Sequence, residues 1–221
     1  MFFRCVSKKI FIALFYNVGM KIFDPYEIEQ ASMKIIQNVI GKEYSGPEEN
    51  LPVIKRVIHA TADFDFFNNL YFSDNAVKKA REALRKNTPV ITDTLMLASG
   101  ISKKYNLKII CRVADENIKL EAKEKNLTRS IINIEHAVKD FPSAIYAIGN
   151  APTALIRLCE LIKEGKAAPA LVIGVPVGFV NVIEAKKMLA ELENIPRIIA
   201  HGRKGGTTVA CAIVNALLYG L

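Results

Sequence analysis

The residue types best suited to acid–base chemistry gather around His59, in the segment Arg56-Val57-Ile58-His59-Ala60-Thr61-Ala62-Asp63. Histidine is the side chain whose ordinary titration lies closest to neutral pH, and a histidine partly sheltered beside a cation has its neutral form favoured. The pattern therefore predicts a group that takes or gives a proton near neutral pH. A structural histidine with satisfied ring nitrogens is the alternative.

Two glycine-containing loops that follow apolar runs are candidate ligand sites. Segment 149–155 combines a glycine turn, the polar side chain of Asn150 and a proline at a helix start. The free amides of such a helix start can hold a carboxylate or a phosphate, although a tight turn with an ordinary cap gives the same pattern. Segment 174–181 holds two glycines and a proline, and loops on adjacent βα units line the same edge of a sheet.

A third loop, 201–208, joins the cations Arg203 and Lys204 to a glycine-rich helix start. A guanidinium, an ammonium and free amides together suit an anion. Lys204 precedes the glycine pair, whereas a Walker A loop has its lysine after the last glycine, and no G-x-G-x-x-G follows a predicted strand. Nucleotide cofactors therefore lose support. Arg129, in the first turn of another predicted helix, is poorly placed for the helix dipole, which makes it a further candidate ligand contact.

These residues must be positioned by a regular alternation of short apolar runs and amphipathic stretches. The predicted strands are 70–72, 90–92, 108–113, 144–148, 171–174 and 197–200. The predicted helices between and after them are 74–86, 93–105 with a break near Gly100, 115–126, 128–139, 152–163, 181–192 and 207–218. This order predicts a three-layer α/β fold with a mainly parallel sheet and helices on both faces, in which ligands bind beyond the carboxyl ends of the strands.

Two further helices are predicted before the first strand. One begins at Asp24, which can cap it, and ends at Gly41, with Ser32 near its middle. The other carries Ile54, Val57, Ile58 and Thr61 on one side, which makes Arg56 and His59 neighbours one turn apart. The competing prediction for this second segment is a strand, because it is rich in β-branched residues.

Composition fits one domain, over residues 20–221, that buries a large core: the chain has 221 residues, of which 51% are hydrophobic. The net charge of +8 suits an acidic small molecule, a nucleic acid or a membrane surface. Four widely spaced cysteines without a C-x-x-C pair predict buried thiols in a reducing cytoplasm, and no spacing predicts a metal site. Residues 1–19, with three cations before an apolar run too short to span a bilayer, are interpreted as a dispensable extension or an upstream start; a targeting segment is the alternative.

From about Met20 to Leu221, the chain resembles the precorrin-8X methylmutase family, also described as cobalt-precorrin-8 methylmutases. The resemblance lies in four segments: Arg56–Asp63, Gly149–Leu155, Pro169–Val180 and Gly202–Gly206. It implies an isomerase of cobalamin biosynthesis that shifts a methyl group from carbon 11 to carbon 12 of a corrin-type macrocycle, without a redox or nucleotide cofactor.

The resemblance also implies roles for individual residues. His59 is the proton donor or acceptor, and Ser32 and Arg56 contact the substrate. Arg129, Asn150, Arg203 and Lys204 are expected as further contacts to its acetate and propionate arms, which would explain the positive charge. The family resemblance also implies a homodimer with substrate sites near the interface.

Two other functions remain open on the sequence. A carrier protein for a tetrapyrrole would use the same anion-binding loops without catalysis. A nucleic-acid-binding protein is suggested by charge alone, and no run of five or six basic residues supports it. Neither nucleic acid nor a membrane is expected as a partner.

Overall fold

The computed structural model describes residues 24–41 and 43–221 and contains a six-stranded sheet with the order β1-β6-β5-β4-β2-β3. The β1 strand runs antiparallel to β6, and every other neighbouring pair is parallel. The strands are β1 (Leu70–Phe72), β2 (Val90–Thr92), β3 (Ile109–Ile110), β4 (Ile145–Ile148), β5 (Leu171–Gly174) and β6 (Arg197–Ala200). The predicted mainly parallel sheet is confirmed.

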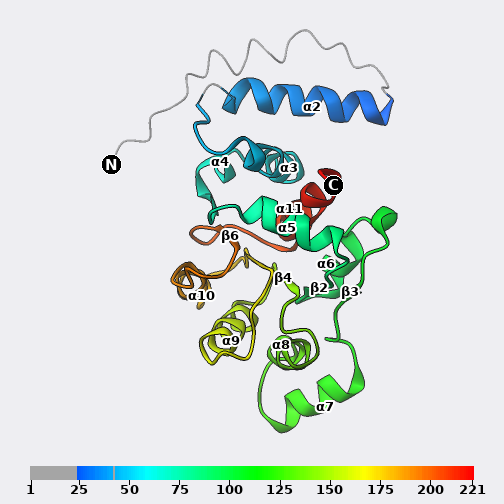
Figure 1. Ribbon diagram of the computed structural model, residues 1–221, viewed down its shortest axis with the longest axis vertical. Helices are drawn as coiled ribbons and strands as arrows, with labels where there is room; N and C mark the ends of the chain where they lie inside the picture. The colour runs from blue at the N-terminus through cyan, green and yellow to red at the C-terminus, as the bar shows by residue number, and fades with distance from the viewer. Residues whose placement is uncertain (1–23, 42) are drawn as a thin grey trace.

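Helices cover both faces of this sheet (Figure 1). One face carries α3 (Leu51–Thr61), α5 (Ala76–Arg85), α6 (Leu95–Gly100) and α11 (Thr207–Tyr219), with α2 (Pro25–Ile40) packed outside α3. The other face carries α8 (Arg129–Asp140), α9 (Pro152–Lys163) and α10 (Val182–Ala190), with α7 (Glu116–Glu124) against α8. Short helical segments lie at Glu48–Asn50, Phe66–Asn69 (α4) and Lys103–Tyr105. The three predicted layers are therefore present, and α2 adds a layer outside one of them.

The period of two along the strands divides the core against the sheet into two clusters, one on each face, and a small third cluster of Ile118, Ala122 and Ile132 lies between α7 and α8. On β4, Ile145 and Ala147 pack with the cluster beneath α11, whereas Tyr146 and Ile148 pack with the cluster beneath α9. All four side chains are buried, as expected for a central parallel strand with helices on both faces.

The two helices before the first strand form as predicted. The Asp24 carboxylate caps α2 by accepting a hydrogen bond from the Tyr26 amide at 2.7 Å. The segment with His59 is α3, so the competing strand prediction is wrong: Val57 and Ile58 are fully buried because α3 packs along α11. Ala62 ends α3 in the left-handed conformation, with φ of 53°.

Side-chain amides explain how two predicted elements are interrupted. The predicted strand 108–113 is reduced to Ile109–Ile110, because the Arg112 amide donates to Asn133 Oδ1 at 2.8 Å instead of to a strand. The predicted helix 93–105 breaks after Gly100, where Asn215 donates to the Gly100 carbonyl and accepts from the Ser102 amide. The predicted break near Gly100 is confirmed.

The proposed extension at residues 1–19 lies outside the described residues. Among those that are described, no helix combines the length and the apolar character needed to cross a bilayer. Cys111, Cys159 and Cys211 are free thiols as predicted, but only Cys159 of these three is buried, whereas Cys111 and Cys211 are partly exposed.

Candidate active site

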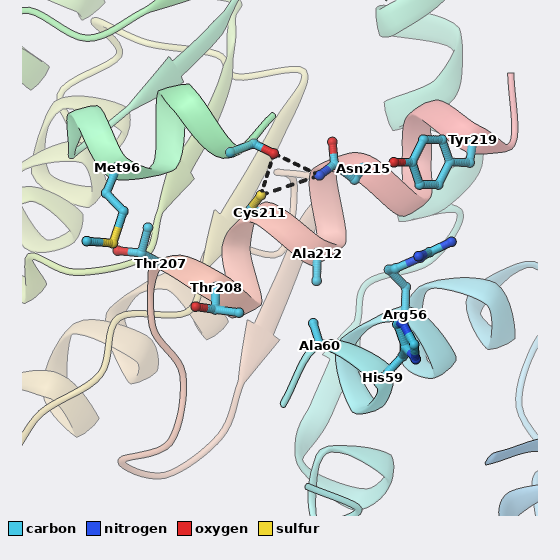
Figure 2. A pocket seen from close by; sticks show the side chains of 11 residues that line it. Arg56, His59, Ala60, Met96, Thr207, Thr208, Cys211, Ala212, Asn215 and Tyr219 are labelled. Carbon is cyan, nitrogen blue, oxygen red and sulfur yellow. Dashed lines mark hydrogen bonds between the residues drawn. The ribbon is translucent and has the colours of Figure 1, made fainter. Parts of the chain in front are cut away.

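A cavity of about 290 Å³ lies along the outer side of α11, between α3 and α6. Figure 2 shows α11 passing between the two other helices, with His59 and Arg56 on α3 and Met96 on α6. The lining residues are Arg56, His59, Ala60, Met96, Gly100, Thr207, Thr208, Cys211, Ala212, Asn215 and Tyr219. His59 and Arg56, predicted as neighbours, therefore open on the same cavity.

The His59 imidazole has no hydrogen-bond partner among residues 24–41 and 43–221. Its polar neighbours are engaged elsewhere: Thr61 donates to the Val57 carbonyl at 2.8 Å, and Asp63 binds Lys204 at 2.7 Å. The ring is half-buried at the edge of the cavity. Both ring nitrogens are therefore available to a ligand, which argues against the alternative of a satisfied structural histidine.

Arg56 is held on two sides. Its Nη2 donates to Glu29 Oε1 at 2.6 Å, and its guanidinium carbon lies 4.9 Å from the centre of the Tyr219 ring. The ion pair comes from α2 and the aromatic ring from the end of α11. These contacts fix the guanidinium at the edge of the cavity before any ligand binds.

The α6 side of the cavity is joined to α11 by hydrogen bonds to the Gly100 carbonyl. Cys211 Sγ donates to this oxygen at 2.9 Å, and Asn215 Nδ2 donates to it at 3.0 Å (Figure 2). A side chain at position 100 would be crowded, because a Cβ there would lie 2.8 Å from the sulfur of Cys211. Burial raises the pKa of the Cys211 thiol, so it stays protonated at neutral pH and is a poor nucleophile.

Of the six predicted substrate contacts, five do not line this cavity: Arg203 and Lys204 lie in the loop before α11, and the other three lie elsewhere. Ser32 is half-buried on α2, and its hydroxyl donates to the Ile28 carbonyl of the same helix at 2.9 Å. Arg129 and Asn150 are exposed at the starts of α8 and α9. Both lie near the carboxyl edge of the sheet. The starts of their two helices are close together, because Thr128 Oγ1 and Thr153 Oγ1 are 3.4 Å apart. The roles of these three residues stay predictions.

The backbone amides of residues 149–151, directly before α9, are not free to bind a ligand's carboxylate or phosphate, because the Asp93 carboxylate already binds them. One Asp93 oxygen accepts from the Gly149 amide at 3.1 Å, and the other accepts from the Asn150 and Ala151 amides at 2.7 Å each. This is a correction to the anion-site interpretation: the protein supplies its own anion. Burial raises the pKa of the Asp93 carboxyl, and these amides partly offset that effect.

The basic loop before α11 is bound from both sides. The Lys204 ammonium donates to Asp63 at 2.7 Å and to Asp65 at 2.6 Å, and these bonds raise its pKa. In this arrangement Lys204 is neutralised by two carboxylates, which weighs against the predicted contact to a substrate arm. Arg203 is exposed, and no described residue forms an ion pair with it.

The same loop is fixed from beneath by Lys186. Its buried ammonium donates to the carbonyls of Gly202 and Lys204 at 2.8 Å each, and burial lowers the pKa of Lys186 to about 8. The loop also meets segment 174–181, since the Gly206 amide donates to the Val175 carbonyl at 2.8 Å. The two glycine loops predicted to lie at one edge of the sheet, 149–155 and 174–181, follow the neighbouring parallel strands β4 and β5. The Val175 amide donates to the Ile148 carbonyl at 3.0 Å, and this prediction is confirmed.

Sequence reasoning missed Asp93, Lys186 and the polar residues of α11. Asp93 directly follows a predicted strand, in the position where ligand chemistry was expected, so its place was a usable signal. Thr208, Cys211 and Asn215 recur every three or four residues in an otherwise apolar helix. That spacing places them on one side of α11, and this was the signal for the cavity.

The fold and the cavity define a three-layer α/β protein with a histidine and a fixed arginine at one pocket. A family model described as precorrin-8X methylmutase matches residues 27–220. A cobalt-precorrin-8 methylmutase of Priestia megaterium is 41% identical over 197 residues, which cover 87% of each chain. A precorrin-8X methylmutase of Pseudomonas aeruginosa is 38% identical over 73% of this chain and 80% of its own.

A solved structure agrees with this relationship. The crystal structure of the precorrin-8X methylmutase of Thermus thermophilus superposes with a TM-score of 0.81 at 36% identity, covering 88% of this chain and 95% of that one. The chain belongs to the precorrin-8X methylmutase family. Methylmutases are isomerases, so the protein is an enzyme of that class.

Proposed function

We propose that this enzyme moves a methyl group from carbon 11 to carbon 12 of precorrin-8X or cobalt-precorrin-8, giving hydrogenobyrinate or cobyrinate, with His59 as the acid–base group. The observation that carries the proposal is the free His59 ring beside the fixed Arg56 guanidinium at one cavity. The names of the relatives supply the substrate class, and their coverage of the chain makes the transfer reasonable. The cytoplasm is the proposed location.

His59 would act by giving a proton to the conjugated ring system. Protonation makes the carbon that receives the methyl group poorer in electrons, which lowers the barrier to migration. Returning the proton to the imidazole completes the isomerisation, so nothing is consumed. A well-placed acid–base group contributes roughly 10²–10⁴-fold to a rate.

Arg56 would hold the macrocycle against that proton donor. Its ion pair with Glu29 and its stacking on Tyr219 reduce the freedom that it loses when a carboxylate arm binds. Ser32, Arg129, Asn150 and Arg203 complete the proposed set of substrate contacts, and Lys204 would join them by exchanging Asp63 and Asp65 for a substrate carboxylate. Since several of them lie away from the cavity, a second copy of the chain is proposed to bring some of them to the macrocycle.

The test compares the wild type with His59→Ala and His59→Asn, using precorrin-8X and cobalt-precorrin-8 side by side. We expect both variants to lose at least about 10²-fold in kcat while they still bind hydrogenobyrinate. Absorbance spectra measure both the conversion of substrate and the binding of hydrogenobyrinate. The ratio of the wild-type rates with precorrin-8X and with cobalt-precorrin-8 identifies the preferred substrate.

Unchanged conversion by folded His59→Ala would overturn the acid–base role. Binding of the corrinoid by the wild type without conversion of either substrate would favour a carrier protein. His136→Ala is the matched control, since His136 pairs with Glu121 on the other face of the sheet and does not line the cavity.

A further inference from the structure

A second cavity, of about 420 Å³, lies beyond Arg56 and is not used by the acid–base chemistry. It is enclosed by α2, α3, α5 and the last turn of α11. Its lining residues are Glu29, Gln30, Met33, Pro52, Lys55, Arg56, Arg81, Ala216, Tyr219 and Gly220. Arg56 and Tyr219 line both cavities, so the two spaces meet at this stacked pair.

The charges in this second cavity are unbalanced. Among the described residues of the lining, Lys55, Arg56 and Arg81 supply three cations, whereas Glu29 supplies the one carboxylate. Glu29 is already bound to Arg56 at 2.6 Å. Lys55 donates to the neutral amide oxygen of Gln37 at 3.2 Å, so it has no ionic partner there.

Arg81 is the cation of this cavity that no described residue binds through a hydrogen bond or an ion pair. Its Nε is buried and has no hydrogen-bond partner, and no ion pair joins its guanidinium to any residue of 24–41 or 43–221. A buried donor without an acceptor is costly, at about 1–3 kcal/mol, and native proteins seldom keep one without a reason.

The surroundings position Arg81 without neutralising it. The guanidinium lies against the backbone of Gly220, where a Cβ would collide with it. The negative end of the α11 dipole is close by and makes a cation tolerable, but it supplies no carboxylate. A planar guanidinium with free donors is the group that binds a carboxylate through two parallel hydrogen bonds.

We propose that this second cavity is a carboxylate subsite, in which Arg81, assisted by Lys55, binds one acetate or propionate arm of the corrinoid. The inference rests on the proposed function, because it takes its ligand from that reaction. The macrocycle would lie over the His59 cavity, and one of its arms would pass the Arg56–Tyr219 pair to reach Arg81. Arg81 is then a specificity-determining residue, because it favours ligands in which that arm is an ionised carboxylate.

The experiment uses full-length Arg81→Met, which keeps the apolar stem and removes the charge. The matched control is Arg85→Met, one turn further along α5 and exposed. For Arg81→Met we expect the KM for the substrate and the Kd for hydrogenobyrinate to rise about 10-fold to 100-fold, which is the usual loss for a charged hydrogen-bonded pair. The kcat should change less than about threefold, since His59 is untouched, and Arg85→Met should stay within about twofold in all three constants.

A merely structural Arg81 is distinguished by changing the ligand as well. Forms of hydrogenobyrinate with one arm converted to a primary amide are titrated against the wild type and Arg81→Met. The monoamide whose changed arm would bind Arg81 should bind the wild type about 10-fold or more weakly than hydrogenobyrinate does. Its affinity for Arg81→Met should almost equal that of hydrogenobyrinate, because this variant already lacks the guanidinium that binds the arm. Arg81→Lys, which keeps the charge but loses the fork, should bind hydrogenobyrinate with intermediate affinity.

The outcomes separate the two proposals. If the wild type converts the substrate but no amide position couples to Arg81, or if the KM of folded Arg81→Met is unchanged, the subsite is wrong and the proposed function stands. If the wild type converts neither precorrin-8X nor cobalt-precorrin-8 and binds neither hydrogenobyrinate nor cobyrinate, the proposed function fails and the subsite fails with it.

Discussion

The buried carboxylate of Asp93 accepts hydrogen bonds from backbone amides that are far away in the sequence but follow the neighbouring strand. Asp93 follows β2 but caps the start of α9, 56–58 residues further on. Its side chain is almost fully buried, and so is the Gly149 amide that it satisfies. The position of Asn150, a proposed substrate contact, therefore depends on a carboxylate from another strand.

Replacing Asp93 by alanine should lower the free energy of unfolding by roughly 2–4 kcal/mol, because three amides lose their acceptor and at least one is buried. Asp93→Asn should lose less, since its single oxygen can still accept from Asn150 and Ala151. Urea unfolding followed by circular dichroism measures both. The control is Asp115→Ala at the start of α7, where the side chain makes no cap bond and we expect a change below about 0.5 kcal/mol. Equal losses for Asp93→Ala and Asp115→Ala would contradict this account.

At the scale of elements, the basic loop 201–206 depends on an ammonium that α10 buries beneath it. The neighbouring Lys187 is exposed on the same helix, so one helix carries two lysines with opposite surroundings. The Lys186 ammonium is shielded from water and donates hydrogen bonds to two carbonyl oxygens instead. Its pKa of about 8 in the folded protein lies below the 10.5 of a free lysine.

This difference predicts how stability depends on pH. Between about pH 8 and pH 10.5 the folded protein gives up the Lys186 proton while the unfolded chain keeps it, so this group makes the wild type more stable as pH rises. The free energy of unfolding of the wild type minus that of Lys186→Met should therefore increase from pH 7.5 to pH 9.5. Denaturant titrations at both values test this, with Lys187→Met showing no such trend. If the difference in free energy of unfolding between the wild type and Lys186→Met is the same at pH 7.5 and pH 9.5, the two carbonyl oxygens keep the pKa of Lys186 at its ordinary value.

The periodic elements could be predicted from sequence far better than the contacts between them. The strands 70–72, 90–92, 171–174 and 197–200 have the predicted bounds, because each is a short apolar run between polar turns. The partners of Asp93 and Lys204 could not be predicted, since they are set by which loops meet at the edge of the sheet. The pairing of Lys204 with Asp63 spans 141 residues. Local pattern carries no information about such a contact.

At the scale of the whole molecule, exposed apolar side chains gather beside the start of α11. Phe179 is 87% exposed and Val180 is 77% exposed in the loop before α10, and Met96 is 71% exposed where it lines the cavity. Val177 of the same loop lies close to Gly206, which places this surface next to the site. Apolar groups concentrated in this way mark an interaction surface. The proposed homodimer, with substrate sites near the interface, would cover it.

A charge on this surface should therefore affect assembly and catalysis together. We expect Phe179→Asp to shift the protein from dimer to monomer in sedimentation-velocity runs and to lower kcat/KM, because an interface loses its apolar contact and gains a charge that must be desolvated. Leu120→Asp is the matched control: Leu120 is 59% exposed on α7, at the opposite end of the molecule from α2 (Figure 1), and should change neither property. A wild type that sediments as a monomer at micromolar concentration, or a dimer unaffected by Phe179→Asp, would show that this surface does not join two copies. If Phe179→Asp stays dimeric but loses activity, the exposed ring belongs to the substrate site itself.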